Sequence, residues 1–212
     1  MKTNYQKILD NTLEQISKLD VKPTLLLHSC CAPCSTYVLS YLSKYFKIVV
    51  FYYNPNIYPT SEYYKRVEEQ KMFINKFNLD YNPINKVEFI EGVYNKEDFY
   101  NISKGLENEP EGGLRCVECY NLRLTEAALK AKEINADYFT TTLSISPMKN
   151  AEALNTIGLK IGEKYNIKYL LSDFKKKDGF KKSVQISNNY KMYRQDYCGC
   201  EYSKNEMLEK RM

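Results

Sequence analysis

The chain has 212 residues, of which 43% are hydrophobic, so it is long and apolar enough to form one globular domain with a real core. Its formal net charge of +5 is a small surplus, which permits nucleic-acid binding but does not establish it. No apolar run approaches the roughly 20 residues of a membrane span, and the charged N-terminal segment has no apolar signal region, so we expect a cytoplasmic protein without a membrane partner.

The hydrophobic pattern predicts strands and helices in alternation. Apolar residues at helical spacing predict a helix over 4–19, and a continuous apolar run predicts a buried strand over 24–28. The next segments predict, in order, a helix over 35–45, a strand over 47–53, a helix over 61–77 with Ser61 as its N-cap, and a strand over 81–89. The remaining segments predict a short helix within 92–114, a helix over 116–132, a strand over 137–143, a helix over 150–164 and a strand over 167–171.

This order of elements predicts an α/β fold. A strand, a helix and a strand early in the chain make a βαβ unit, whose two strands lie parallel. We therefore expect one domain over 1–212, built on an open parallel sheet with helices on both faces, with a polar and basic C-terminal extension from about residue 173. Sites in such sheets lie beyond the carboxyl ends of the strands, where we expect 28–31, 142–146 and 172–173.

Seven cysteines fall into three groups, which in a chain expected to be cytoplasmic favours metal or redox chemistry over structural disulfides. Cys31 and Cys34 have the C-x-x-C spacing, and Cys116 and Cys119 repeat it. Two such pairs can form a tetrathiolate site for zinc or an iron–sulfur cluster, and each is expected near a helix N-terminus, which stabilises thiolate charge. Cys30 is then a fifth thiol, which a closed structural zinc site would not need.

Two smaller features leave alternatives open. Cys198 and Cys200 flank one glycine, and the pair can be a local disulfide, a dithiol relay, a set of additional metal ligands or two reduced structural thiols. His28 is the only histidine, and it ends the first predicted strand. It can donate a proton or contact a metal at the mouth of the site, or it can be a hydrogen-bonded scaffold residue.

Basic residues occur beside aromatic ones towards the end of the chain. Phe174 and Phe180 lie among lysines, and tyrosines lie near Arg194. Cations beside aromatic rings suit a phosphate backbone and an unstacked base, although a run of charges is as often a solvated surface. The basic residues concerned are Arg115, Arg123, Arg194, Lys175, Lys176, Lys177, Lys181 and Lys182.

The loop after the first predicted strand has the sequence HSCCAPCS and contains no glycine that would let the backbone approach a pyrophosphate. Adenylating α/β enzymes carry a glycine-rich phosphate loop at this position. We therefore do not expect ATP to be used there.

Several stretches of the chain together resemble a known family. They are LLLHSCCAPCS, YNPNIYP followed by EYYKR, LRCVECYNLRL, FTTTLSISPMKN, SDFKKKDGF and YRQDYCGCEYS, and they span about 21–203. In these stretches the chain resembles the QueH family of epoxyqueuosine reductases. The resemblance implies a HUP-like (Rossmann-like) α/β fold with a cysteine-bearing helical insertion. It also implies an oxidoreductase of tRNA processing, which removes the epoxide oxygen of epoxyqueuosine at the wobble position in the last step of queuosine biosynthesis.

The resemblance further implies a [4Fe–4S] cluster, a further iron ion beside it, and a low-potential electron donor of the ferredoxin or flavodoxin type. Carried onto this chain, the cluster ligands are Cys31, Cys34, Cys116 and Cys119, and Cys30 is the thiol that faces the adjacent metal or the substrate.

The same resemblance implies a redox disulfide of Cys198 and Cys200 near the site. Removal of the epoxide oxygen as water takes two protons, and by hypothesis His28 or a tyrosine supplies one. The residues expected to contact tRNA are Arg115, Lys175, Lys176, Lys177 and Arg194. Two other functions remain compatible with the cysteine spacing, namely a zinc-stapled RNA-binding module without catalysis and a cluster-dependent tRNA sulfur-transferase, which would need ATP.

Overall fold

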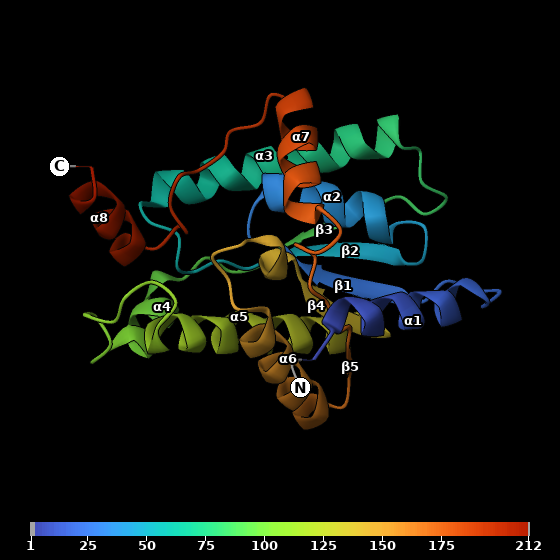
Figure 1. Ribbon diagram of the computed structural model, residues 1–212, viewed down its shortest axis with the longest axis horizontal. Coiled ribbons are helices and arrows are strands. Elements are labelled where there is room, and N and C mark those ends of the chain that lie inside the picture. Colours follow the sequence, from blue (N-terminus) through green and yellow to red (C-terminus); the bar gives the residue numbers. More distant parts are fainter. Residues whose placement is uncertain (1–2, 212) are drawn as a thin grey trace.

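The structure, a computed structural model, describes residues 3–211 and contains a parallel sheet between layers of helices (Figure 1). The strands are β1 (Thr24–His28), β2 (Lys47–Tyr52), β3 (Glu88–Glu91), β4 (Tyr138–Thr141) and β5 (Lys168–Tyr169), in the order β3-β2-β1-β4-β5. The helices are α1 (Tyr5–Ser17), α2 (Ala32–Leu42), α3 (Thr60–Asp80), α4 (Lys96–Ser103), α5 (Leu114–Glu133), the 3-10 helix η1 (Thr142–Ile145), α6 (Ala151–Tyr165), α7 (Gly179–Asn189) and α8 (Glu201–Glu209). The predicted α/β class is confirmed.

Strand β1 lies in the centre of the sheet because its side chains are apolar on both faces. Leu25 and Leu27 point into one hydrophobic core, whereas Leu26 points into the other. Leu26 is in register with Val49 of β2 on one side and with Phe139 of β4 on the other. A strand covered on both faces is expected to be continuously apolar. The strand predicted from this pattern, 24–28, has the same bounds as β1.

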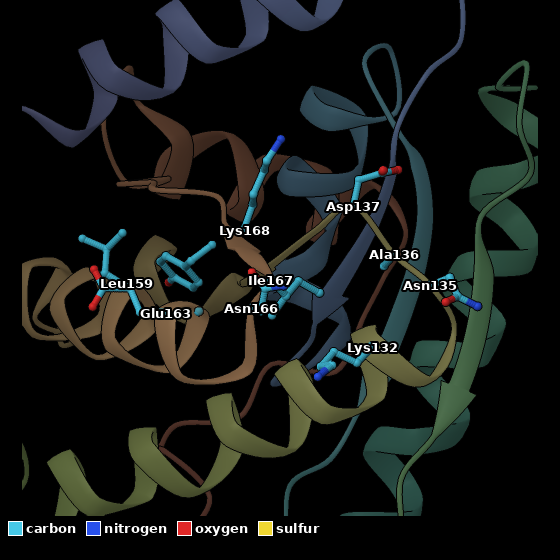
Figure 2. A pocket seen from close by; sticks show the side chains of 11 residues that line it. Lys132, Asn135, Ala136, Asp137, Leu159, Glu163, Asn166, Ile167 and Lys168 are labelled. Carbon is cyan, nitrogen blue, oxygen red and sulfur yellow. The ribbon is translucent and has the colours of Figure 1, made fainter.

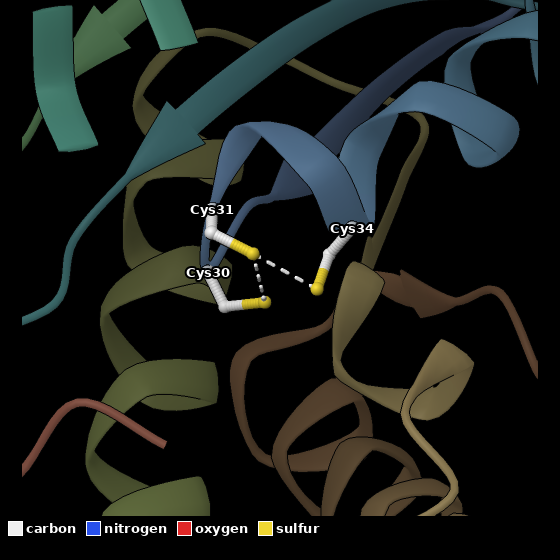
Figure 3. A group of neighbouring side chains, drawn as sticks. All are labelled: Cys30, Cys31 and Cys34. Carbon is white, nitrogen blue, oxygen red and sulfur yellow. Dashed lines mark hydrogen bonds between the residues drawn. The ribbon is translucent and has the colours of Figure 1, made fainter. Parts of the chain in front are cut away.

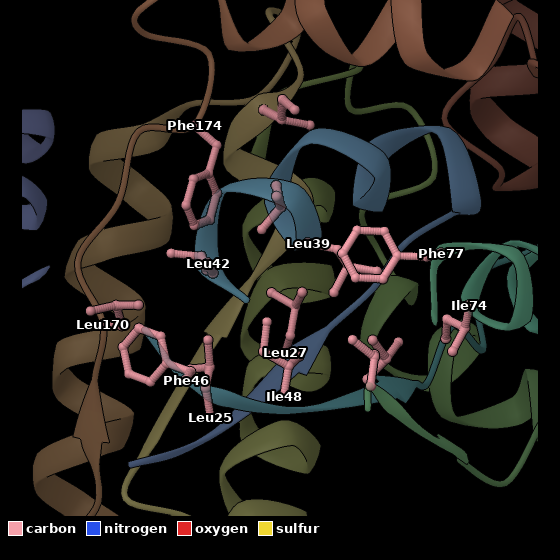
Figure 4. Close-up of a cluster of buried hydrophobic side chains, with 14 of the residues drawn as sticks. Leu25, Leu27, Leu39, Leu42, Phe46, Ile48, Ile74, Phe77, Leu170 and Phe174 are labelled. Atoms are coloured by element: carbon pink, nitrogen blue, oxygen red, sulfur yellow. The ribbon is translucent and has the colours of Figure 1, made fainter. Parts of the chain in front are cut away.

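The two cores hold the helical layers against the sheet. The first core joins α1, α2 and α3 to the sheet, and Leu39, Phe46 and Phe77 are fully buried in it (Figure 4). The second core lies under α5 and α6, where Ala127 and Ala131 on α5 let the helix approach the sheet closely. Helices therefore cover both faces of the sheet, as predicted.

The order of the strands makes the loops after two neighbouring strands, β1 and β4, run in different directions. From β1 the chain crosses over to β2, and it later returns to place β4 on the other side of β1. The loops that leave the carboxyl ends of β1 and β4 therefore run to different sides of the sheet and leave a crevice between them. Ligand sites in open α/β sheets form at such a point.

Several element bounds differ from prediction. Helix α2 begins at Ala32 with Cys31 as its N-cap, so Cys34 lies in its first turn. Helix α3 begins at Thr60 after an N-cap Pro59, and the predicted cap Ser61 lies inside the helix. The strand predicted over 81–89 is confined to β3, because the residues before it form the turn that leaves α3.

The C-terminal extension folds more than its polar sequence suggested. Helix α7 packs on α2, and α8 packs beside α4 through contacts of Tyr202 with Phe99. The buried residues of α7 are Gly179, Ser183 and Ser187, so small residues rather than an apolar stripe form its contact with α2. Among the residues described, no helix combines the length and the apolar character that crossing a bilayer requires.

Candidate functional site

Three thiols converge at the carboxyl end of β1. The Sγ atoms of Cys30, Cys31 and Cys34 all lie within 4.8 Å of one another (Figure 3). Cys31 and Cys34 are 2.9 Å apart through sulfur, and Cys30 and Cys31 are 3.9 Å apart. The convergence follows from the local fold, because Cys31 caps α2 and Cys34 occupies its first turn, one helical turn further on. We call these residues the three-thiol group.

Contacts among the three thiols shift their pKa values in opposite directions. Contacts with the Cys31 and Cys34 thiols lower the pKa of Cys30 well below its usual range, and the Arg123 guanidinium and the Thr142 hydroxyl act in the same direction. The contact with Cys30 in turn raises the pKa of Cys31 to about 12 and raises that of Cys34. The site therefore favours a thiolate at Cys30, and thiolates are the species that bind metals.

A cavity of about 370 Å³ opens onto this group at the carboxyl edge of the sheet. Its wall combines the three thiols with Lys149 from the loop after η1, Phe180 from α7, and the segment that contains Arg194 and Cys198. We call it the carboxyl-edge cavity. Its volume lies within the range of small-ligand sites, and it occupies the crevice that the sheet order creates.

The remaining cysteines lie outside the three-thiol group. Cys119 and Cys200 are buried together with Phe99 in one apolar cluster, whereas Cys198 lines the carboxyl-edge cavity. Burial raises the pKa of Cys116 and of Cys119. Of the four predicted cluster ligands, Cys31 and Cys34 belong to the three-thiol group, together with Cys30. The other two, Cys116 and Cys119, do not belong to this group within residues 3–211.

The thiols of Cys198 and Cys200 are both free, so the expected disulfide is not formed in this structure. Glycine at position 199 has a φ of +130°, which other residues rarely adopt, and it directs the two side chains to different surroundings. Burial raises the pKa of Cys200 to about 12, while Cys198 receives a hydrogen bond from the Lys149 ammonium at 3.0 Å.

Arg123 connects the two cysteine regions. The residue is 2% exposed and lines the carboxyl-edge cavity with Cys30. Its guanidinium donates to Asn54 Oδ1 and lies 3.9 Å from Cys119 Sγ. Among the residues described, no carboxylate pairs with it. The thiols outweigh the effect of burial and raise its pKa. A buried cation without a carboxylate is costly, so the fold at this point is suited to negative charge on the sulfurs.

His28 does not lie at the mouth of the site, where it was expected. Its imidazole is fully buried, with Nδ1 2.8 Å from Thr141 Oγ1 and Nε2 3.1 Å from the Tyr53 carbonyl. Burial and then the charge of Arg123 lower the pKa of His28 to about 3. A buried, neutral imidazole is consistent with the prediction that His28 is a hydrogen-bonded scaffold residue, and it does not favour a role as proton donor.

The basic residues divide into buried and exposed sets. Arg115 is 1% exposed and donates to the carbonyls of Leu106 and Glu107, so it does not face a nucleic acid. Phe174 is also buried, in the first core, whereas Phe180 is exposed at the cavity.

The lysine run has a similar division. Lys175 and Lys177 form ion pairs with Asp173 and Asp10, and Lys176 and Lys177 are both exposed. Arg194 lines the cavity and donates to Ser187 Oγ at 2.8 Å. In the lysine run, Lys176 is therefore the exposed lysine without an ion-pair partner among residues 3–211.

Two residues of the site had no signal in the sequence pattern. Lys149 lies in a loop, where an isolated lysine is normally solvated, yet here its side chain is 5% exposed. Gln70, buried on α3, exchanges hydrogen bonds with Ser35 and accepts one from Ser29 at 2.7 Å, which fixes the start of α2 behind the thiols. Neither contact can be read from residue spacing.

The donor set fits a thiophilic metal centre. Several soft sulfur ligands near a buried guanidinium suit iron or zinc better than magnesium or calcium, which prefer oxygen. The three-thiol group alone offers fewer ligands than a closed four-thiolate site. An additional ligand from α5 or an open coordination position would complete it.

Comparison with known proteins gives a consistent result. A family model described as Epoxyqueuosine reductase QueH matches residues 25–206. The chain is 44% identical over 204 residues to an epoxyqueuosine reductase QueH from Staphylococcus epidermidis (strain ATCC 12228 / FDA PCI 1200), covering 95% of this chain and 85% of that protein. It is 42% identical over 202 residues to the protein of that name from Streptococcus pyogenes serotype M1, covering 95% and 78%. The protein of the same name from Thermotoga maritima is 35% identical over 190 residues, covering 88% and 93%.

Proposed function

This chain belongs to the QueH family of epoxyqueuosine reductases, and we propose that it reduces epoxyqueuosine in tRNA to queuosine, the last step of queuosine biosynthesis. The reaction takes two electrons and two protons and releases the epoxide oxygen as water. The observation that carries the proposal is the three-thiol group at the floor of a nucleoside-sized cavity in a chain of this family.

The proposed cofactor is a [4Fe–4S] cluster with a further iron ion. The convergence of Cys30, Cys31 and Cys34 supports thiolate ligation, and Cys116 and Cys119 at the start of α5 are the proposed additional ligands. When bound, such a centre would supply electrons one at a time and a Lewis acid beside the substrate. The proposed electron source is a low-potential donor of the ferredoxin or flavodoxin type.

The chain's own residues prepare the site for this chemistry. Arg123 holds positive charge beside the sulfurs, and the Thr142 hydroxyl, 3.4 Å from Cys30 Sγ, stabilises a thiolate there. Phe180, exposed at the cavity wall, offers a ring on which an unstacked base can lie. The proposed phosphate contacts are Lys176, which is exposed, and Arg194, which lines the cavity.

The test is an anaerobic assay of epoxyqueuosine-containing tRNA with a low-potential reductant, read by mass spectrometry of the nucleosides. We expect queuosine to appear in step with loss of epoxyqueuosine, and the purified protein to contain iron and absorb visible light. Cys119→Ala should remove colour and activity together, whereas Lys168→Met, at the opposite edge of the sheet, should change neither. Zinc without visible absorption, together with unchanged epoxyqueuosine, would contradict the proposal and favour a zinc-stapled RNA-binding module.

A further inference from the structure

Lys149 is a buried ammonium in the wall of the carboxyl-edge cavity. It follows η1, on the loop that leaves the carboxyl end of β4. Its backbone is held on both sides, because its N–H donates to the Ser146 carbonyl at 3.1 Å and its carbonyl accepts from Lys175 Nζ at 3.2 Å. A lysine fixed in this way and 5% exposed through its side chain is not a solvated surface charge.

Two polar neighbours hold the ammonium in place. Lys149 Nζ donates to Glu111 Oε1 at 2.9 Å and to Cys198 Sγ at 3.0 Å. An ammonium group has three donors, and residues 3–211 provide these two side-chain acceptors, so one N–H is left for a group in the cavity. Burial alone would lower the pKa of Lys149, but Cys198, Tyr120 and Glu111 outweigh burial and raise it. The side chain is therefore protonated at neutral pH.

Other candidate acids around the cavity are less suitable. His28 does not line it and is held neutral, as described above. The hydroxyl of Tyr197 is turned away, donating to the Tyr58 carbonyl at 2.7 Å. Arg123 lines the cavity, but a guanidinium does not release its proton in proteins.

We propose that Lys149 is the proton donor to the epoxide oxygen of the substrate. The inference rests on the proposed function, which requires an acid at this oxygen. Two electrons from the low-potential donor break the two C–O bonds of the epoxide and leave a carbon–carbon double bond, while the oxygen takes up two protons and leaves as water. Nζ supplies the first proton as the first C–O bond breaks, and the resulting amine is reprotonated from solvent through the cavity opening. An alkoxide is a stronger base than an amine, so this transfer is downhill.

Substitutions at this position separate a proton donor from a simple counter-charge. In Lys149→Met we expect kcat to fall by at least about 100-fold, with tRNA affinity and iron content within twofold of the wild type. Lys149→Arg keeps the charge but cannot give up a proton, so it should remain nearly as slow. The matched control is Lys168→Met, an exposed lysine at the opposite sheet edge, which should keep wild-type kcat.

A second measurement reports the proton itself. Small primary amines added to Lys149→Ala should restore part of the rate, more for amines of lower pKa, as Brønsted behaviour requires of an acid. Wild-type kcat in Lys149→Arg, or kcat within threefold of wild type in Lys149→Met, would overturn proton donation. If Lys149→Met does not fold, Lys149→Gln keeps a polar group between Glu111 and Cys198 and takes its place. An inactive wild-type enzyme would instead contradict the proposed function, so the two failures are distinguishable.

Discussion

Cavities lie at both edges of the sheet, and they differ in what lines them. The cavity at the amino ends of β4 and β5, the amino-edge cavity, has a volume of about 700 Å³ (Figure 2). Its polar groups are exposed residues such as Lys132, Asp137 and Lys168, and no cysteine lines it. The carboxyl-edge cavity has about half that volume and is lined by Cys198, Lys149 and the three-thiol group. The smaller cavity therefore contains the reactive groups.

The difference follows from the geometry of a parallel sheet. At the carboxyl edge, the loops after β1 and β4 diverge and leave backbone and side chains facing one crevice. Two of the charged groups there, Arg123 and Lys149, are buried, and their interactions are stronger than in water. At the amino edge the charges are solvated and screened. Buried cations beside thiols at one edge, rather than cavity volume, distinguish the candidate site.

Loss of a thiol should have the largest effect on activity and bound iron, and it tests the difference between the two cavities. Cys31 is 1% exposed and central in the three-thiol group. Cys31→Ser should lower activity and bound iron by at least about 100-fold, because a hydroxyl is a poor ligand for soft metals. Iron analysis and the nucleoside assay measure it. Lys132→Met at the amino-edge cavity should keep both values, and equal losses in the two variants would contradict the distinction between the edges.

Substitution of Arg123 should have the second-largest effect on bound iron and activity. Arg123→Met removes the cation beside Cys30 and Cys119, so negative charge on the sulfurs becomes more costly. We expect bound iron and activity to fall by about 10- to 100-fold, and Arg123→Lys to be intermediate. Arg115→Met is the matched control, since this arginine is equally buried on α5 but pairs with Glu206 and two backbone carbonyls. Full iron content in Arg123→Met would show that the guanidinium is structural only.

The fold could be predicted further than the site. Strand β1 was predicted to the residue because its apolar run ends at polar neighbours, and α5 and α6 were predicted because apolar residues recur along them. Helix α7 was missed because its buried face consists of glycine and serines, which carry no hydrophobic period.

The sequence predicted which residue types form the site, but not which of its polar side chains are buried. Three of the cysteines were placed at the correct sheet edge because they follow a predicted strand. His28, Arg115 and Arg123 were expected near solvent or nucleic acid, yet all three are buried. Burial of a single polar side chain depends on which distant segments pack over it. Here Arg123 contacts His28 and Asn54, which lie far from it in the sequence, and Glu206 of α8 contacts Arg115. No local pattern indicates these contacts.

A pH experiment sharpens the comparison, because His28, at the carboxyl end of β1, is fully buried and its pKa is lowered by that burial. The pKa of His28 is about 3 in the folded protein, below its ordinary value of 6.5. Between these values the unfolded chain binds a proton that the folded chain does not, so stability is full above about pH 6.5 and falls as the pH falls. When the pH falls from about 7.5 to about 5, His28 should therefore lower the free energy of unfolding of the metal-free protein by about 2 kcal/mol.

Urea unfolding of the wild type and of His28→Gln measures this cost. The chain has one histidine, so carboxylates contribute equally to both proteins and cancel in the difference. The stability difference between the two should change by about 2 kcal/mol over this pH range. A difference that stays constant would show that His28 is protonated in the folded protein.

The smallest effect concerns tRNA affinity and again compares the two edges. Lys176 and Lys181 are exposed on the loop and helix that bring Phe180 to the carboxyl-edge cavity, and neither ammonium has an ion-pair partner among residues 3–211. Lys176→Ala/Lys181→Ala should weaken tRNA binding several-fold and reduce the salt slope by about one to two, because each phosphate contact releases a counterion.

Binding isotherms between about 50 and 200 mM salt measure that slope. Lys132→Ala/Lys168→Ala removes the same number of charges from the amino-edge cavity and is the matched control. Equal weakening by both double variants would mean that net charge, rather than a docking surface at the carboxyl edge, attracts the tRNA. A loss confined to Lys176 and Lys181 would place the phosphate backbone at the edge that contains the thiols, where a wobble nucleoside must enter to reach them.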